Sequence, residues 1–296
     1  MFHSPLGAVI GAENLDRTGS FLSLFGFQPA AKGELSAAAA AVLHGHDGPL
    51  EVVTLTASGS EQGVVHLVGS LPSAPAGHPP YQLGAHAFDV YTRDIATSAE
   101  SARAAGWSVG PIGHVELGPL VMDQVMIAGP DNLVVVLIQS DRRRPSLLDT
   151  DPAAAHSEGH SLVWAVDDVS AALGFWRQLA GLVVPFDAPV AHPEVNRFMQ
   201  LPDQDVSLRM AMVCDEAVTP MRFELLEFVG VDSSPARAEG TAGLLWPVFS
   251  VEDLDAAASA ITAAGGSTGD AVDTDLGRTL IALAPGGERL QLVEGS

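Results

Sequence analysis

One pattern occurs four times along this chain of 296 residues: an apolar stretch, an acid or amide, a stretch that is rich in Ala in the last three copies, and a glycine. The short acid or amide side chain can accept hydrogen bonds from the unpaired N–H groups that begin a helix. Glycine most readily takes the left-handed conformation that ends one. The repeat therefore predicts four strand–helix units, capped at Asn14, Asp94, Asp168 and Asp253 and ended at Gly26, Gly106, Gly181 and Gly265.

Each predicted helix is followed by segments dense in Val, Leu, Phe and Met, which Gly, Pro, Asp and Asn turn signals separate. The repeated order is strand, helix, then several strands. We expect modules at residues 1–72, 83–140, 158–230 and 243–296. Residues 1–140 hold the first two modules, residues 141–157 are a linker, and residues 158–296 hold the last two. The Pro-rich stretch "SLPSAPAGHPP" predicts a second linker, before the second module.

Acidic residues outnumber basic ones by 36 to 14, and this balance argues against nucleic acid or an anionic membrane as a partner. The only basic run, Arg142 to Arg144, is interpreted as a solvated or acid-paired part of the linker. Cys214 is the single cysteine, so no intrachain disulfide forms. Because the sequence has no signal-peptide pattern and no long apolar run, we expect a cytoplasmic protein. Its expected partner is a small-molecule ligand, and a homodimer is a possible assembly.

Several phrases, "VDDVSAALGFWRQLAGL", "FELLEF", "VEDLDAAASAITAAGG" and "GGERLQLVEG", resemble the module openings and endings of the vicinal oxygen chelate superfamily. This superfamily includes glyoxalase I, extradiol dioxygenases and bleomycin resistance proteins. The resemblance covers nearly the whole chain. It implies an α+β fold of four βαβββ modules that form two half-open barrels, each with a concave face for a ligand.

The resemblance also implies metal ligands on the first and last strands of the modules. The last-strand position holds His66, Val136, Glu224 and Gln291. The first-strand position holds Gly7, Ala87, Ser161 and Trp246, of which none is a usual ligand. One residue earlier the second and third modules carry His86 and His160. This offset of one residue decides whether these two histidines are ligands.

In a regular strand an offset of one residue turns a side chain to the opposite face, which would place His86 and His160 beneath their helices. A single bulge in each strand would instead turn them toward the concave face. Glu224 stands between Phe223 and Leu225 on an apolar strand. A carboxylate buried there needs a metal, a proton or a basic partner.

Two ligand sets for a divalent ion (Fe, Mn, Zn or Ni) follow from the two ways in which the modules can pair. If the second module pairs with the third, His86, His160 and Glu224 form a two-histidine, one-carboxylate set. If the third pairs with the fourth, the set becomes His160, Glu224 and Gln291, with Trp246 in the fourth place. The sequence leaves both pairings open.

Other polar residues are candidates of lower rank. His114 and His192 lie in predicted loops or strand edges and are alternative catalytic acids or bases beside Glu224. Tyr91, Arg197 and Trp246 are candidate substrate contacts. Asp89 and Tyr91 share the cavity-side phase of the first strand of the second module.

Three functions fit these residues. The first is metal-assisted lyase or isomerase chemistry on a substrate with vicinal oxygens. The second is ring cleavage by an Fe(II) dioxygenase. The third is not catalytic: a resistance-type protein that binds and sequesters a ligand in its apolar concavity.

Overall fold

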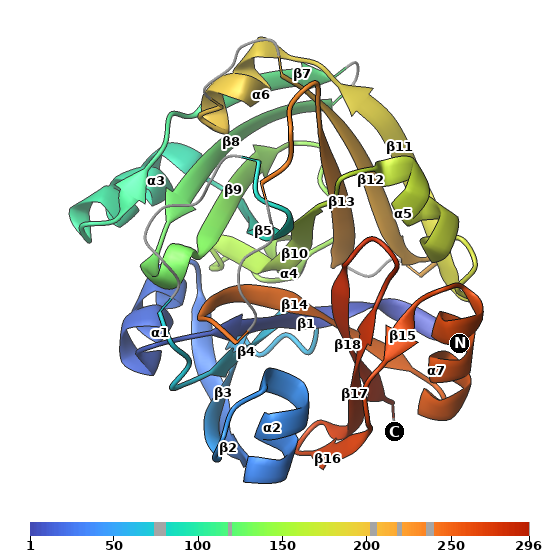
Figure 1. Cartoon of the computed structure of the whole chain (residues 1–296). Coiled ribbons are helices and arrows are strands. Elements are labelled where there is room, and N and C mark those ends of the chain that lie inside the picture. Colours follow the sequence, from blue (N-terminus) through green and yellow to red (C-terminus); the bar gives the residue numbers. More distant parts are fainter. Residues whose placement is uncertain (74–80, 118–119, 202–205, 218–220, 235–239, 296) are drawn as a thin grey trace.

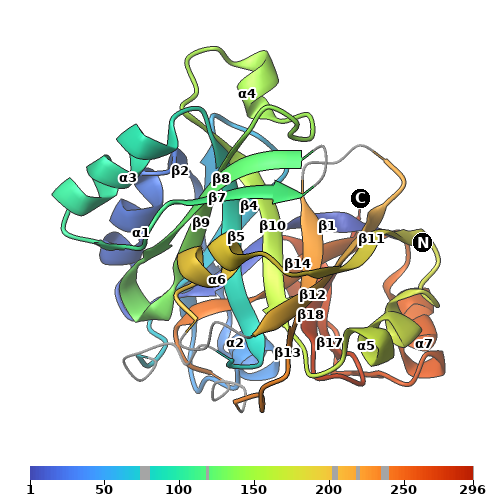
Figure 2. The same ribbon diagram turned by 90° about the horizontal axis from the view of Figure 1, so that it is seen from above.

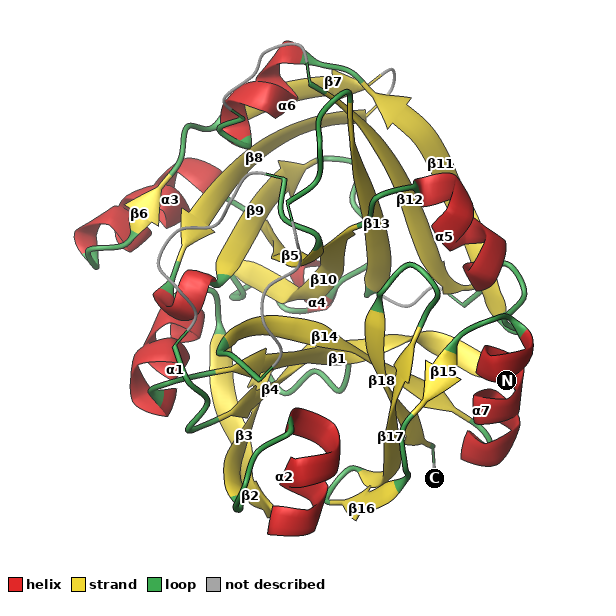
Figure 3. Ribbon diagram, in the orientation of Figure 1, coloured by secondary structure: helices red, strands yellow, loops and turns green. Residues whose placement is uncertain are grey.

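Two nine-stranded sheets form the protein (Figure 1). The computed structural model describes residues 1–73, 81–117, 120–201, 206–217, 221–234 and 240–295. Most of the predicted linker "SLPSAPAGHPP" lies outside the described residues. Neither sheet closes into a barrel, and the strands in Figure 3 curve around two concave faces that point in opposite directions. The predicted α+β class of four strand–helix–strands modules is confirmed.

The first sheet combines the first and fourth modules, in the strand order β15-β17-β18-β14-β1-β4-β3-β2, with β16 beside β17. The elements of the first module are β1 (Phe2–Gly11), α1 (Leu15–Ser23), β2 (Phe27–Leu35), α2 (Ala37–His44), β3 (Leu50–Ala57) and β4 (Val64–Val68). Those of the fourth are β14 (Gly243–Val251), α7 (Leu254–Ala263), β15 (Ser267–Thr268), β16 (Val272–Thr274), β17 (Gly277–Leu283) and β18 (Arg289–Glu294).

The second sheet combines the two middle modules, in the order β11-β12-β13-β10-β5-β9-β8-β6, with β7 beside β8. The second module contributes β5 (Gly84–Thr92), α3 (Ile95–Ala104), β6 (Ser108–Val109), β7 (Gly113–Leu117), β8 (Leu120–Ala128), the 3-10 turn η1 (Pro130–Asn132) and β9 (Val134–Ser140). The third contributes β10 (His156–Ala165), α5 (Val169–Trp176), β11 (Leu182–Val190), α6 (Pro193–Phe198), β12 (Ser207–Asp215) and β13 (Arg222–Val229), after the linker helix α4 (Leu147–Thr150).

This pairing decides between the two alternatives that the sequence left open. The second module shares a sheet with the third, while the first module pairs with the fourth through β1 and β14. Each sheet therefore draws on both residues 1–140 and residues 158–296. The division of the sequence into halves is not the division into sheets, because strand pairing depends on contacts between distant segments that no local pattern reveals.

The four helices begin at the predicted caps, and all but α5, which ends at Trp176, end within three residues of the predicted glycine. Each of the four predicted caps accepts a hydrogen bond from the N–H group three residues ahead, and the four predicted terminal glycines all have positive φ. In the last three modules a side chain at the end of the last strand also accepts from the first helical N–H group. These acceptors are Gln139 for Ile95, Glu227 for Val169 and Glu294 for Leu254. The closing strand thus fixes the start of its own module's helix.

The convex faces of the two sheets pack against each other around one apolar core. Strands β1 and β14 lie against β5, β12 and β13, and Figure 2 shows the strands of the two sheets crossing, with α3, α5 and α7 at the periphery. Trp176 of α5 stacks on Phe249 of β14 with 5.7 Å between ring centroids, and its Nε1 donates to Glu288 Oε1 at 3.1 Å. Aromatic and polar contacts therefore both join the third module to the fourth across the sheet boundary.

Helix α2 occupies much of the concave side of the first sheet, between β2 and β16 (Figure 1). Its last residue, His44, stacks on the buried Trp246 ring with centroids 5.1 Å apart. Arg289 donates to the Leu43 carbonyl at 3.0 Å, and its guanidinium carbon lies over the Trp246 ring, 4.6 Å from the ring centroid. These side chains leave a pocket of only about 300 Å³ in this concavity.

Among the residues that the structure describes, none of the helices has the length and apolar character needed to cross a bilayer.

The contact between Gly63 and Gly159 tests the packing of the sheets. Gly63 has φ +61°, and its carbonyl accepts from Gly159 N–H at 3.1 Å. An added Cβ on Gly63 would lie 2.9 Å from Gly159 Cα and closer still to its N and O atoms. We expect Gly63→Ala to lower the free energy of unfolding by about 1–3 kcal/mol, measured by urea denaturation.

The matched control is Gly174→Ala in α5, where an added Cβ meets nothing within 4 Å. This change should raise the stability by up to about 1 kcal/mol, since alanine is the better helix former. A Gly63→Ala protein as stable as wild type would mean that the two sheets do not approach each other here as described.

Candidate functional site

A cavity of about 670 Å³ lies on the concave face of the second sheet. Its volume is in the range of pockets that hold small organic molecules. Most of the lining is apolar, and both middle modules contribute to it. The polar lining residues are His86, Asp89, Tyr91, Gln124, Ser140, Arg142, Arg144, His160, Arg222 and Glu224.

β-bulges bring both histidines to this cavity. On β5, Ala85 pairs with Trp164 and Ala87 with Val163, so His86 is an extra residue in the ladder. On β10, His160 is the extra residue in the same way, because its two neighbours pair with consecutive residues of β5. An extra residue changes the side-chain phase of a strand. Both histidines therefore line the cavity, as the bulged alternative requires.

The same bulge occurs in the first sheet. There the extra residues in the ladder between β1 and β14 are Leu6 and Leu245, which occupy the positions equivalent to His86 and His160. The bulge is thus a property of the repeated module and does not depend on histidine. In each middle module a histidine occupies the position that the bulge directs toward the concave face.

The floor of the cavity contains a row of three polar residues on adjacent strands. Asp89 of β5 pairs with Ser161 of β10, which pairs in turn with Arg222 of β13. Glu224 lies two residues beyond Arg222 on the same face, beside Val163. Strands in a sheet lie about 4.8 Å apart, so this geometry gathers two acids and one guanidinium at one point of the floor.

Burial changes the proton affinity of both acids. It raises the pKa of Glu224 to about 7, although the Arg222 charge acts in the opposite direction. Burial also raises the pKa of Asp89 well above its ordinary value, as does the charge of Glu224, while Arg222 lowers it. Asp89 Oδ1 has no hydrogen-bond partner among the described residues. At neutral pH the two carboxyl groups therefore hold a proton that can be transferred.

Arg222 contacts side chains on the two strands that flank β13. Its guanidinium donates to His160 Nε2 and, at 2.8 Å, to the sulfur of Met212. The His160 ring lies on the Tyr91 ring with centroids 3.9 Å apart, and the Tyr91 hydroxyl accepts from Arg144 N–H at 3.4 Å. Arg222 is thus held in place at the floor and carries its positive charge into the cavity.

The three predicted metal ligands His86, His160 and Glu224 all line the cavity. The described part of the chain contains no group of three or more His, Cys, Asp or Glu side chains placed to hold a metal. The lone pair of His160 Nε2 that a metal would need is directed at the Arg222 guanidinium. Metal binding by His86, His160 and Glu224 therefore stays a prediction, and the chemistry derived below uses none.

The alternative ligand set with Gln291 is wrong, because Gln291 lies on β18 in the other sheet. Its Oε1 accepts from Trp246 Nε1 at 3.2 Å, and Trp246 is buried in that sheet's own concavity. Neither residue can share a site with Glu224. Trp246 does not line the cavity that contains Glu224, so a substrate contact through Trp246 stays a prediction.

Three further candidates, His114, His192 and Arg197, are not among the residues that line the cavity. His114 on β7 bonds to Asp123 at 2.7 Å and to Glu116 at 3.3 Å, and these acids raise its pKa. His192 caps α6, where its Nδ1 accepts from Glu194 N–H at 3.2 Å.

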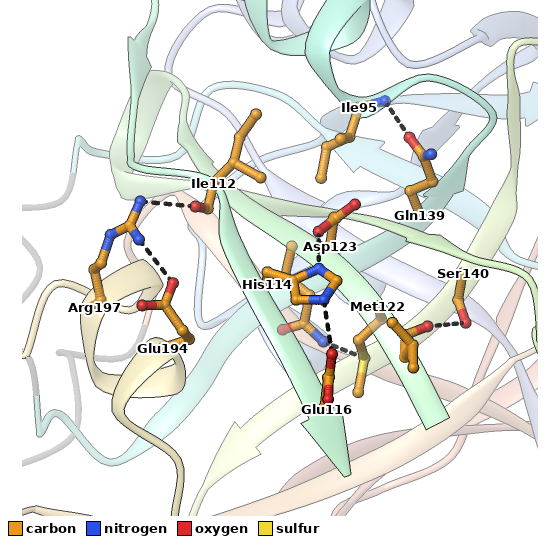
Figure 4. Close-up of polar contacts among 12 residues, drawn as sticks. Ile95, Ile112, His114, Glu116, Met122, Asp123, Gln139, Ser140, Glu194 and Arg197 are labelled. Carbon is orange, nitrogen blue, oxygen red and sulfur yellow. Dashed lines mark hydrogen bonds and ion pairs between the residues drawn. The ribbon is translucent and has the colours of Figure 1, made fainter. Parts of the chain in front are cut away.

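Arg197 extends this polar network on the outer surface. It bonds to Glu194 Oε2 at 2.8 Å and to the Ile112 carbonyl at 3.0 Å (Figure 4). The arginine therefore ties α6 to the segment before β7, and a role in substrate binding has no support from its position. Tyr91 alone among the predicted substrate contacts lines the cavity.

Arg222 and the methionines that line the cavity were not among the residues predicted from the sequence. The alternation of side chains along a strand could have revealed both. Arg222 precedes Glu224 by two residues, so the two side chains lie on the same face of β13. Methionines recur with even spacing on β8 and β12, and the cavity lining includes Met122, Met126, Met210 and Met212.

The raised pKa of Glu224 predicts a dependence of stability on pH. Below pH 4.5, its ordinary pKa, the carboxyl is protonated in both states; as the pH rises to about 7 the unfolded state loses the proton first. The wild type therefore loses stability across this window, and Glu224→Gln does not. We expect the variant to gain roughly 1–3 kcal/mol relative to wild type between pH 4 and pH 8, measured by urea denaturation.

Glu100→Gln on the exposed face of α3 is the control and should keep the wild-type profile. Parallel profiles for wild type and Glu224→Gln would show that this carboxyl is not buried as described.

Comparison with known proteins supports the fold. No family model matches the chain, and no curated protein matches it. Among solved structures, glyoxalase I from Zea mays has a TM-score of 0.69 at 17% identity, covering 98% of this chain and 92% of that one. A provisionally named dioxygenase from Bacillus subtilis subsp. subtilis str. 168 has a TM-score of 0.67 at 10% identity, with 99% and 85% covered. The chain thus has the same fold as these two structures.

Proposed function

We propose that this protein is an isomerase or lyase that moves a proton on a small molecule with oxygens on neighbouring carbons. The observation that supports this most is the pair of buried acids, Asp89 and Glu224, beside Arg222 on the floor of the cavity. An acid whose pKa lies near the working pH can both accept and return a proton. Perturbed acids in a cavity are typical of catalytic sites.

In the proposed step, the Glu224 carboxylate takes the proton from a carbon next to a carbonyl group. The C–H bond breaks and its electron pair moves to the carbonyl oxygen, which forms an enolate. Return of the proton from Glu224 to the former carbonyl carbon, together with transfer of the hydroxyl proton of the first carbon to the enolate oxygen, gives the isomer with its carbonyl and hydroxyl groups exchanged. Expulsion of a leaving group from the next carbon instead gives the lyase outcome.

Arg222 and Asp89 stabilise the charge that this step creates. The guanidinium of Arg222 carries a permanent positive charge and has donors directed into the floor of the cavity. Burial and the charge of Glu224 raise the pKa of Asp89 and so favour its protonated form, which can donate a hydrogen bond to the enolate oxygen. Fixed donors of this kind are most effective where water is excluded.

The cavity walls provide that exclusion. Met122, Met126, Met210 and Met212 form a flexible apolar surface around the polar floor. A bound molecule would replace water next to the acids and strengthen their interaction with it.

The apolar wall also supports a second candidate, binding without catalysis. A methionine-lined cavity adapts to ligands of varied shape and would suit sequestration of a hydrophobic molecule. Stoichiometric binding with no proton exchange in the experiment below would favour this alternative.

Proton exchange tests the proposal. We expect wild-type protein in D₂O to speed the loss of the carbon-bound proton NMR signal from α-hydroxy ketones such as 2-hydroxyacetophenone. The rate should rise with pH up to about 7, where Glu224 loses its proton, and then level off. Glu224→Gln should lower the rate by about 10²–10⁴-fold, because the base is lost.

Glu116→Gln on the outer strand β7 is the matched control and should exchange at the wild-type rate. Equal rates for wild type and Glu224→Gln would remove Glu224 from the mechanism. A thermal-shift measurement on each variant shows whether the ligand still binds.

The metal-assisted and Fe(II)-dependent versions of the function have their own test. Because the donors do not converge on one point, we expect Mn, Ni, Zn or Fe(II) to leave the Tm of chelator-treated protein unchanged within about 1 °C. If a metal instead raises the Tm by several degrees and His160→Ala abolishes this increase, His86, His160 and Glu224 would bind the metal. Oxygen uptake with a catechol would then point to ring cleavage.

A further inference from the structure

Two arginines on the open side of the cavity have no role in the chemistry above. Arg142 and Arg144 follow the end of β9 and both line the cavity. Arg142 is exposed and Arg144 half-buried, so they lie where the cavity meets solvent. Arg143, between them, does not line the cavity and pairs with Asp149 of α4 at 2.5 Å. In this basic run Arg143 therefore has a structural role, while Arg142 and Arg144 reach the cavity.

Within the described residues, the side chains of Arg142 and Arg144 make no ion pair and no hydrogen bond. Other arginines of this acidic chain do: Arg177 and Arg209 both pair with Asp187, and Arg278 pairs with Asp255. Arg93 and Arg289 donate to backbone carbonyl groups, whereas the guanidinium groups of Arg142 and Arg144 have neither kind of contact within the described residues. Their charge is available to a ligand.

The backbone holds these two residues against the cavity wall. Arg144 N–H donates to the Tyr91 hydroxyl at 3.4 Å, and Arg142 N–H donates to Ser140 Oγ at 3.2 Å. The two guanidinium groups therefore start from fixed points at the rim. Planar guanidinium groups match the oxygens of carboxylates and phosphates.

The interior determines which end of a ligand these arginines can bind. On the floor the positive charge of Arg222 is offset by the neighbouring acids Asp89 and Glu224, whereas Arg142 and Arg144 at the rim make no ion pair within the described residues. The walls between floor and rim are apolar and rich in methionine, whose sulfur packs well against aromatic rings. A ligand fits best with its anionic group at the rim and an apolar ring system within.

We propose that the ligand of this cavity is an anion with a flat apolar body, whose carboxylate or phosphate group binds Arg142 and Arg144. Its other end, which carries the uncharged oxygens, reaches Arg222 and Glu224. This inference rests on the proposed function, because it names the substrate class of the same cavity.

The experiment compares two probes of the same shape, 2-naphthoate and its neutral amide 2-naphthamide, by isothermal titration calorimetry with the full chain. We expect wild type to bind the carboxylate about tenfold more tightly than the amide, and the ratio to fall with added salt. The double variant Arg142→Gln/Arg144→Gln should bring the ratio close to one. Arg143→Gln is the matched control and should keep the wild-type ratio.

Equal affinities in wild type, a carboxylate preference that survives the double variant, or no binding of either probe at millimolar concentration would overturn the proposal. Tighter binding of 2-naphthyl phosphate than of 2-naphthoate would identify a phosphate as the head group. Glu224→Gln should keep the preference for the anion. The proton-exchange experiment tests the proposed function, and the binding ratio tests the arginines at the rim. Either proposal can therefore fail without the other.

Discussion

The extra residue in each first strand is the constraint on which the site depends. A strand places alternate side chains on opposite faces, so one inserted residue decides which residues reach the concave side. In the middle modules it brings His86 and His160 to the cavity while Asp89 and Ser161 keep their own inward phase. In the first sheet the equivalent residues are Leu6 and Leu245. One backbone feature thus serves two quite different interiors.

The interiors differ through a few side chains at matching positions. Glu224 stands where the first sheet has Gln291, and Ser161 where it has Trp246. The indole of Trp246 fills the space, donates to Gln291 and stacks on His44 of α2. The second sheet has small or unbranched side chains at the corresponding places and remains hollow. The pair resembles a duplicated scaffold in which one copy was filled and the other kept for a ligand.

Local patterns were sufficient to predict the modules, because the capping residues Asn14, Asp94, Asp168 and Asp253 act within one turn of helix. Strand pairing could not be predicted, since β1 selects β14 from a distance of more than two hundred residues. Glu224 was found from its unusual apolar neighbours. Arg222 was missed because its importance comes from Asp89 and His160 on other strands, and nothing in its own neighbourhood of the sequence marks it.

The pairing of the modules also sets an order for synthesis and folding on the ribosome. The middle sheet joins consecutive modules, so β5 and β10 can meet as soon as about 165 residues have emerged. Strand β1 already has β4 on one side, but its other edge stays open until β14 appears near residue 243. An open strand edge is a template for wrong pairing. The oldest part of the nascent chain is therefore the last to be completed, and it is the segment for which a chaperone would matter most.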